Sequence, residues 1–333
     1  MPKSRAPLEK PKDRKKALLR LWHYLYQYKW LLFLCLVLTI LSNVFQLVGP
    51  LLSGYAIDAI TGFGKVNFPK VFYYLTLMII FYILSSVFSY IISLLMIRLS
   101  QKVVCHLRQE VFEKLSQLPA GFFDSQQTGD IISRMTYDID NINTSLASDS
   151  VQILSSFITV IGSLIMMLLI SPELVLVFAV TVPGSIFLTK FLTSRFQPLF
   201  AKRSRLLGEL NGFIEELISG QQTIKVYQQE ENTIERFAKK NQEAVDAYYN
   251  AEYYGGMTGP SVNFINNLSL SLISVFGAIL FLYERLTLGN LSSFVLYSRK
   301  FSGPINEFAN IFTDLQSTLA AAERVFRLLD EKI

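Results

Sequence analysis

The side chains most often used in catalysis do not form a catalytic pattern in this sequence. Glu215 and Glu216 are paired carboxylates, but adjacent residues on a helix point about 100° apart, so they cannot act together as general acid and base. Cys35 lies in an apolar segment and Cys105 among charged residues, so neither a disulfide nor a zinc site is expected. We therefore predict no catalytic residue and no metal ligand.

Two adjacent cations, Arg299 and Lys300, interrupt an otherwise apolar segment near the end of the chain. A cation at the centre of a bilayer costs about 2.5–3.5 kcal/mol on insertion scales, so it is expected to face a cavity or a partner. One hypothesis is that Arg299 or Lys300 lines a substrate pathway. The alternative is that both lie near the inner leaflet, where their charged ends reach the headgroups.

Polar amides also occur in apolar surroundings, where each needs a hydrogen-bond partner. They are Asn43, Gln46, Asn263, Asn266 and Asn267. Hydrogen bonding between helices is the favoured interpretation. Lining of a substrate pathway, by Asn43, Gln46, Asn263 and Asn267, is the alternative.

The composition indicates that membrane helices position these side chains. Apolar residues make up 51% and charged residues 17% of the 333 residues, and mean hydropathy is +0.36. No Asp, Glu, Lys or Arg occurs in residues 30–57, 71–97, 150–172, 174–189 or 253–283, and segments of roughly 18 such residues are typical of membrane spans. This excludes an ordinary soluble enzyme. We predict six spans, at residues 30–52, 71–97, 151–170, 174–192, 254–283 and 291–312.

The basic residues predict the orientation. Residues 1–29 hold nine Lys or Arg against Glu9 and Asp13, which is typical of a segment on the cytoplasmic side. We expect a basic tail followed by an interfacial helix rich in Leu and aromatic residues, although a simple extension of the first span is the alternative. Six spans place both termini in the cytoplasm of a plasma-membrane protein, and the net charge of +5 does not indicate nucleic-acid binding.

The charged stretches at residues 98–149 and 195–252 are too periodic to be loops. Leu99, Val103, Leu107, Val111 and Leu115 recur every four residues, which predicts amphipathic helices that continue the spans. About 25 residues per helix would reach nearly 40 Å beyond the membrane. Pro119, Gly121, Gly129 and Gly220 are expected to interrupt these helices, so each excursion is predicted to descend, cross and return. Arg134 and Asp138, four residues apart, are expected to form a local ion pair.

These segments resemble the transmembrane domain of ABC exporters. LSQLPAGFFD at residues 115–124, TGDI at 128–131, SR at 133–134 and Asp138 resemble the first intracellular loop, and EELISG at 215–220 with TIKVY at 223–227 resembles the second. Pro50, Ile57 and Asp58 are similar to the end of the first span, and AAAERVFRLLD at 320–330 to the end of the sixth helix. The stretch YSRKFSGPIN at 297–306 looks most like bacterial multidrug half-transporters.

The resemblance implies an all-α fold of six transmembrane helices with long cytoplasmic extensions, in a domain-swapped homodimer or heterodimer. It also implies coupling helices that dock on a nucleotide-binding domain, carried by position onto residues 126–133 and 219–227. The residues expected to carry that coupling are Phe123, Gln126, Thr128, Gly129, Asp130, Ser133, Ser219, Gly220, Thr223 and Tyr227. Residues 313–333 are then the end of helix six and a linker toward the nucleotide-binding domain.

The 333 residues contain no G-x-x-x-x-G-K-[ST] loop, the pattern that cradles nucleotide phosphates. No cofactor is therefore expected in this chain, and ATP and Mg²⁺ are expected in a nucleotide-binding domain outside it. The predicted function is outward transport of drug-like, lipid or peptide amphiphiles by alternating access, with no catalysis by the chain as given. An ion-coupled secondary transporter is the alternative, although it requires an ionisable site in the midplane.

Overall fold

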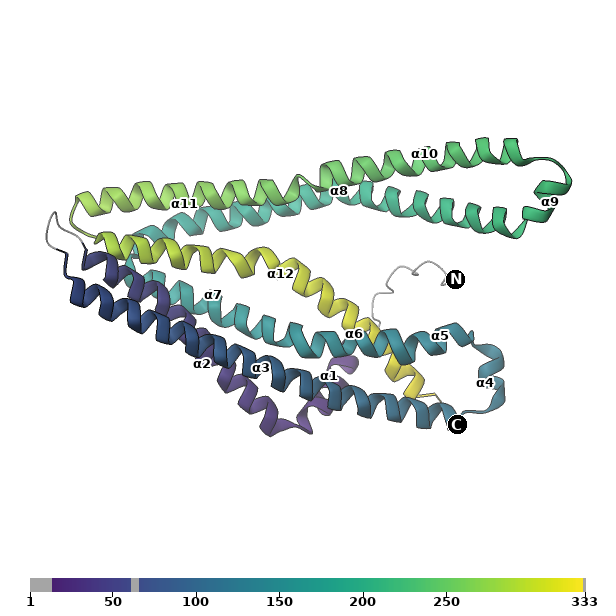
Figure 1. Cartoon of the computed structure of the whole chain (residues 1–333), viewed down its shortest axis with the longest axis horizontal. Coiled ribbons are helices and arrows are strands. Elements are labelled where there is room, and N and C mark those ends of the chain that lie inside the picture. The colour runs from purple at the N-terminus through teal and green to yellow at the C-terminus, as the bar shows by residue number, and fades with distance from the viewer. Residues whose placement is uncertain (1–13, 61–65, 332–333) are drawn as a thin grey trace. The chain divides into compact units, whose positions relative to one another are not determined.

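The computed structural model describes residues 14–60 and 66–331, which form helices joined by short connections, without a strand (Figure 1). The chain divides into two compact units. The hairpin unit comprises Glu173–Ile273, and the main unit comprises the rest of the described chain. The basic tail predicted before residue 14 lies outside the described residues.

Five helical segments are long and apolar enough to cross a membrane. They are Lys29–Asp58, Phe68–Gln117, Thr128–Ile170, Pro172–Ser219 and Glu230–Leu282. They contain the first four predicted spans and all but the last residue of the fifth. The sixth predicted span lies in helix α12 (Leu288–Leu329), which is long enough but is not among the five segments of the described chain that meet both criteria. Its lower apolar content follows from Arg299, Lys300 and several serines and asparagines.

The first helix is separate from the first span. Helix α1 (Arg14–Tyr26) ends before a turn at residues 27–28, and α2 (Lys29–Asp58) begins after it. Ala17, Leu21 and Tyr24 are buried on one face of α1, while Leu18, Leu19 and Trp22 are exposed on another. This confirms a distinct helix rather than an extension of α2, and its exposed apolar face suits a membrane interface.

The predicted continuation of the spans beyond their apolar segments is confirmed. Helix α3 (Phe68–Gln117) is a single helix of 50 residues, about 75 Å long. The return from its far end passes through α5 (Thr128–Ser133), a π-helical turn (Arg134–Asp138), α6 (Ile139–Thr144), a second π-helical turn (Ser145–Asp149) and α7 (Ser150–Ile170). One residue, Ser171, separates α7 from α8 (Pro172–Ser219), as a tight connection requires.

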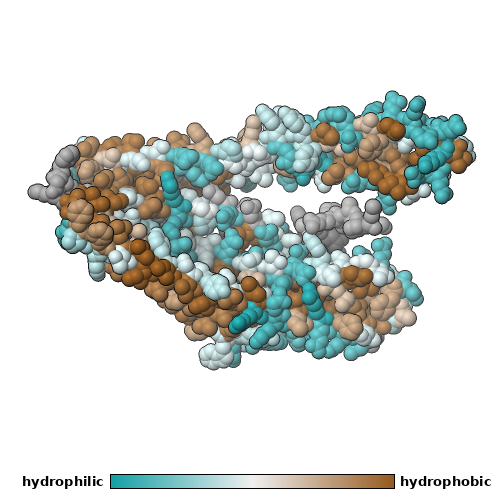
Figure 2. All heavy atoms as spheres, viewed as in Figure 1, coloured by the Kyte–Doolittle hydropathy of each residue, from teal (hydrophilic) through white to brown (hydrophobic). Residues whose placement is uncertain are grey.

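The core of the main unit lies between α1, α3, α6 and α12. Leu99, Leu107, Ile139, Ile142 and Val325 are fully or almost fully buried in one apolar cluster. The apolar residues of α3 that recur every four positions form one side of this cluster. This packing explains why apolar residues continue at helical spacing in α3 beyond its membrane-spanning segment. Figure 2 shows a hydrophobic surface in the region of α2 and α3. Phe72, Ile79 and Ile83 of α3 are exposed.

Helix α12 packs against α2 and α7 in the same unit. Ser293 donates a hydrogen bond to the Pro50 carbonyl (2.8 Å) and Tyr297 donates one to the Leu47 carbonyl (2.5 Å). These two hydrogen bonds join α12 to α2 within one turn of Pro50, a residue that lacks a backbone N–H. Asp58, the last residue of α2, accepts from the Gly289 amide (2.7 Å) and the Thr287 hydroxyl (2.8 Å) at the start of α12.

The hairpin unit consists of two long antiparallel arms. Helix α8 leads through the short α9 (Gln221–Val226) into α10 (Glu230–Gly255), and α11 (Thr258–Leu282) follows after a break at residues 256–257. Thr181 and Ser269 share a hydrogen bond of 3.0 Å between α8 and α11. Farther along, Arg203 of α8 pairs with Glu252 and lies over the ring of Tyr248 on α10, so the arms are held together at two levels along their length.

Candidate functional site

The short helix at the far end of α3 is the first candidate contact site, and we call residues 118–133 the first tip. Helix α3 ends at Gln117, Leu118 and Pro119 are extended, and α4 (Ala120–Ser125) crosses to the returning chain (Figure 1). Gln126 and Gln127 are extended again before α5 begins at Thr128. The crossing helix was therefore misplaced by the prediction of residues 126–133, because most of that range forms the first turns of the returning helix.

The candidate residues of the first tip are largely accessible. Phe123 is 43% exposed and packs edge-to-face on Phe122 with ring centroids 5.5 Å apart, and Phe122 in turn packs on the apolar core. Gln126 is half-buried, whereas Thr128, Gly129, Asp130 and Ser133 are exposed. An exposed aromatic ring on a supported short helix is the kind of side chain that enters a pocket of another protein surface.

The second tip, residues 219–227, lies at the end of the hairpin unit and matches its predicted position. Helix α9 crosses between α8 and α10, and the chain reverses at Gln228, whose φ is +51°. Ser219, Thr223 and Tyr227 are exposed and Gly220 is half-buried. Ile218, Val226 and Tyr227 expose 63%, 77% and 71% of their surface, and a cluster of exposed apolar side chains indicates an interaction site.

The amide of Asn43 is buried between two helices of the main unit. Its Nδ2 donates to the Ser155 hydroxyl (3.2 Å) and to the Thr39 carbonyl (2.8 Å), and its Oδ1 accepts from the Thr159 hydroxyl (3.1 Å). Its donor and acceptor atoms are thus engaged with α7 and with its own helix. This geometry favours a role in helix association over substrate contact.

The other pathway candidates are distributed over both units. Gln46 and Arg299 are exposed and Lys300 is half-buried in the main unit. Asn263 and Asn267 are exposed and Asn266 is half-buried on α11 in the hairpin unit. These candidate residues therefore belong to two different units.

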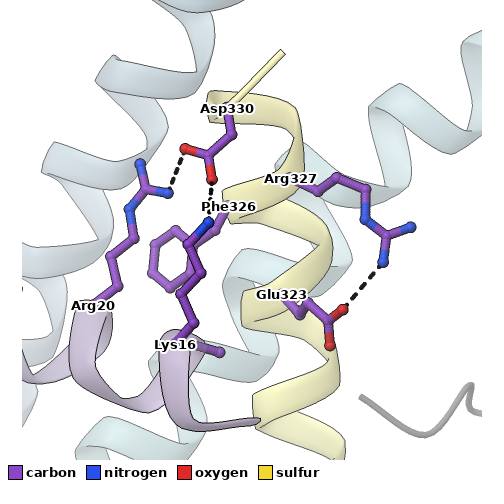
Figure 3. A pocket seen from close by; sticks show the side chains of 7 residues that line it. Lys16, Arg20, Glu323, Phe326, Arg327 and Asp330 are labelled. Atoms are coloured by element: carbon purple, nitrogen blue, oxygen red, sulfur yellow. Dashed lines mark hydrogen bonds and ion pairs between the residues drawn. The ribbon is translucent and has the colours of Figure 1, made fainter. Parts of the chain in front are cut away.

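A cluster that the prediction did not identify joins α1 to the end of α12. Arg20 and Lys16 donate to the two carboxylate oxygens of Asp330 at 2.6 Å and 3.4 Å, and Arg20 lies 4.7 Å from the ring centre of Phe326 (Figure 3). Burial opposes ionisation of Asp330, but the hydrogen bonds and charges of Arg20 and Lys16 prevail and lower its pKa. The outer face of α12 carries a second pair, Arg327 with Glu323 at 3.2 Å.

Tyr24 anchors α1 near its C-terminal end. Its ring stacks on Phe326 with centroids 6.0 Å apart, and its hydroxyl donates to Glu110 of α3. Burial, reinforced by the hydrogen bond and the charge of Glu110, raises the pKa of Tyr24 well above its ordinary value. Helix α1 is therefore bound to both α3 and α12 in the main unit.

The predicted ion pair between Arg134 and Asp138 is wrong. Both oxygens of Asp138 bond instead to Arg324 of α12, at 2.5 Å and 2.8 Å. Asp58, Asp138 and Asp330 all lie in segments that carry the family resemblance. Their position in those segments was the sequence signal that could have identified them as residues of interest. Their partners are far away along the chain, so spacing alone did not reveal them.

No metal or thiol site forms in the part of the chain that the structure describes. Across residues 14–60 and 66–331, no three His, Cys, Asp or Glu side chains gather as metal ligands do. Cys35 is buried and Cys105 is exposed, both as free thiols. The arrangement offers binding surfaces and a polar network between helices.

Comparison with known proteins identifies consistent relatives. A family described as the ABC transporter transmembrane region matches residues 32–305. The chain is 38% identical over 324 residues to the uncharacterized ABC transporter ATP-binding protein YfiC of Bacillus subtilis, covering 97% of this chain and 53% of that protein. It is 35% identical over 281 residues to a fatty acid ABC transporter ATP-binding/permease protein of Mycobacterium tuberculosis (84% and 44% covered).

A third relative is an ATP-dependent lipid A-core flippase of Methylobacillus flagellatus. It is 26% identical over 314 residues, covering 94% of this chain and 52% of the flippase. The chain thus spans about half the length of the curated relatives it matches.

Proposed function

This chain belongs to the ABC transporter transmembrane region family, and on that premise we propose that it forms the membrane part of an exporter. The exporter moves drug-like, lipid or peptide amphiphiles outward by alternating access. The force comes from ATP hydrolysis, with ATP and Mg²⁺ bound in a nucleotide-binding domain outside these 333 residues. The family match does not favour the ion-coupled alternative.

The observation that carries this proposal is the pair of crossing helices on long helical supports. Helices α4 and α9 each follow a helix of about 50 residues and expose an aromatic or apolar group, Phe123 at the first tip and Tyr227 at the second. Two such tips suit docking on nucleotide-binding domains, whose closure would be passed to the spans as a rigid-body motion. The exposed residues of both tips, Thr128, Gly129, Asp130, Ser133, Ser219 and Thr223 included, would contribute to that contact.

The proposed orientation and assembly follow from charge and exposure. Both tips and both termini face the cytoplasm, because the basic residues before and within α1 favour that side, and the protein resides in the plasma membrane. The working unit includes a second transmembrane chain, identical or different. That chain would cover large apolar side chains on the hairpin unit such as Phe187, which is 73% exposed.

The cargo is proposed to be an amphiphile with a long apolar part. The names of two relatives, a fatty acid transporter and a lipid A-core flippase, support this class. Arg299 and Lys300 are proposed to meet the polar end of such a cargo, because cations in a span are expected to face a cavity or a partner. Gln46, Asn263 and Asn267, which are exposed in this chain, are proposed as further contacts.

The test uses the full-length protein with its nucleotide-binding domain, reconstituted in lipid vesicles. We expect ATP-dependent, vanadate-sensitive movement of at least one of three probes, namely a fluorescent fatty acid, a fluorescent phospholipid and a cationic dye. Tyr227→Ala is expected to fold, since the ring is 71% exposed and contributes little to folding. Because the variant loses the proposed contact of the second tip, we expect it to retain ATP hydrolysis and lose transport. Transport driven by a proton gradient without ATP would refute the proposal, and unchanged coupling in Tyr227→Ala would remove the proposed role of the second tip.

A further inference from the structure

Asp138 and Arg324 form a partly buried ion pair between the helix that returns from the first tip and α12. The carboxylate of Asp138 accepts from Nε of Arg324 at 2.8 Å and from Nη2 at 2.5 Å. Asp138 is 2% exposed, and the side chain of Arg324 is 29% exposed. Two parallel hydrogen bonds fix the angle between the groups as well as their distance, so the pair defines the relative position of the two helices.

The local backbone turns Asp138 toward α12. Asp138 closes the π-helical turn Arg134–Asp138, and such turns occur mostly as single insertions, frequently at functional sites. Next to it, Ile139 and Ile142 of α6 and Val325 of α12 are fully buried in the apolar core. Because a buried carboxylate without its partner is strongly unfavourable, this packing and the ion pair support each other.

The ion pair lies between the two segments that matter for coupling, the first tip and the end of α12. Asp138 is ten residues beyond Thr128, where the returning helix begins, which is about 15 Å along the helix. Arg324 is six residues before Asp330, which is bound by Arg20 and Lys16 of α1. The ion pair therefore connects the first tip with the end of α12 and, through it, with α1.

We infer that Asp138 and Arg324 are positioning residues that make the helix returning from the first tip and α12 move as one rigid body. This inference rests on the proposed function, in that the motion originates in ATP-driven closure against α4. A displacement at the first tip is then transmitted directly to the end of α12. Without the pair, the two helices slide on their apolar contacts and ATP hydrolysis is uncoupled from transport.

The chain offers a matched control two residues away. Asp140 pairs with Arg108 of α3 at 2.6 Å, but their side chains are 61% and 48% exposed. Asp140→Asn removes the same charge on the same segment and breaks an exposed ion pair, whose contribution is small. A general effect of charge on this segment would appear in Asp140→Asn as well as in Asp138→Asn.

The experiment uses the full-length protein in lipid vesicles, with a fluorescent fatty acid as transport probe. Spin labels at Thr144→Cys and Asp314→Cys, both exposed positions, report the distance between α6 and α12 in a Cys105→Ser background. We expect one narrow distance in the wild type, with and without ATP and vanadate. Asp138→Asn should broaden it and lower the ratio of transport to hydrolysis at least roughly fivefold, while the exchange Asp138→Arg with Arg324→Asp restores both and Asp140→Asn changes neither.

Two outcomes overturn the inference: an unchanged ratio and distance in Asp138→Asn, or a folded exchange variant that restores neither. If Asp138→Asn does not fold, the exchange variant and Asp138→Glu decide the matter by the same readouts. A wild type without ATP-dependent transport refutes the proposed function instead. The distances still test the rigid body in that case, because the broadening in Asp138→Asn and its reversal by the exchange are expected without nucleotide too.

Discussion

Replacing Asn43 by alanine separates the two roles proposed for polar residues in the spans. Asn43 is 7% exposed and makes two hydrogen bonds to α7, with Ser155 and Thr159, besides one to its own helix. If the amide serves helix association, Asn43→Ala lowers stability and leaves transport of each probe intact. If the amide instead contacts substrate, Asn43→Ala leaves stability nearly unchanged and lowers transport of at least one probe.

The expected loss of stability follows from the two bonds between helices. Such bonds in membrane proteins contribute about 0.6 kcal/mol each, which gives about 1.2 kcal/mol for the pair. In Asn43→Ala the hydroxyl of Thr159 can turn to a carbonyl of its own helix. The loss of its hydrogen bond to Asn43 therefore leaves no buried unpaired group and adds little further loss of stability. With the packing lost by truncation, we expect Asn43→Ala to lower the free energy of unfolding by about 1–2 kcal/mol.

The measurement is SDS-induced unfolding of the full-length protein in mixed micelles. Gln46→Ala is the matched control, because it removes an amide from the same helix at an exposed position, and we expect a change within about 0.5 kcal/mol. A double-mutant cycle of Asn43→Ala with Thr159→Val should give a coupling energy of about 0.6 kcal/mol. Equal stability of Asn43→Ala and Gln46→Ala, with transport lost only in the former, would refute the reasoning.

Three further outcomes are expected. Arg299→Ala or Lys300→Ala should change the transport rate of at least one probe in vesicles, and wild-type rates for every probe in both variants would exclude the pathway hypothesis. Gly289→Ala should impair folding, measured as the yield of monodisperse protein, because its Cβ would lie 2.5 Å from Cγ of Asp58. Gly303→Ala is the control, because a Cβ at that position meets nothing within 4 Å. Because the folded-state pKa of Asp330 is lowered, its stabilising ion pairs are complete above the unfolded pKa of about 3.9 and are lost as pH falls through the folded value. Thermal unfolding should therefore show a smaller acid-dependent loss in Asp330→Asn than in the wild type, and equal losses would contradict this.

The long helices could be predicted because their signals are local. Apolar residues at every fourth position from Leu99 to Leu115 required one continuous face, and the structure buries that face in the core of the main unit. Pro119 correctly indicated the end of α3, since a proline disfavours helical backbone in the residue before it. The separate α1 was visible in the same way, from its apolar and aromatic residues at helical spacing.

The position of the first crossing helix was not local in this sense. Gly129 was taken as a helix breaker, but it lies in the first turn of α5, where glycine is tolerated better than in a helix interior. The actual break after α4 falls at Gln126 and Gln127, which carry no turn signal. Contacts outside this segment, which its local sequence does not encode, therefore determine which of these positions is extended.

The partner of Asp138 could not be read from spacing for a different reason. Residues four apart share a face of an α-helix, which predicted Arg134 as the partner. The π-helical turn at residues 134–138 changes that register, and the true partner, Arg324, is 186 residues away. Pairings of this kind depend on how helices pack, and a local pattern contains no record of it.

The carboxylate at the end of α2 has a mechanical consequence for the connection between α2 and α12. Asp58 uses one oxygen for the Gly289 amide and the other for Thr287, where Gly54 and Gly289 also bring the two backbones together. These contacts tie the two helix ends together, so we expect α2 and α12 to stay in contact here in any rearrangement of the main unit.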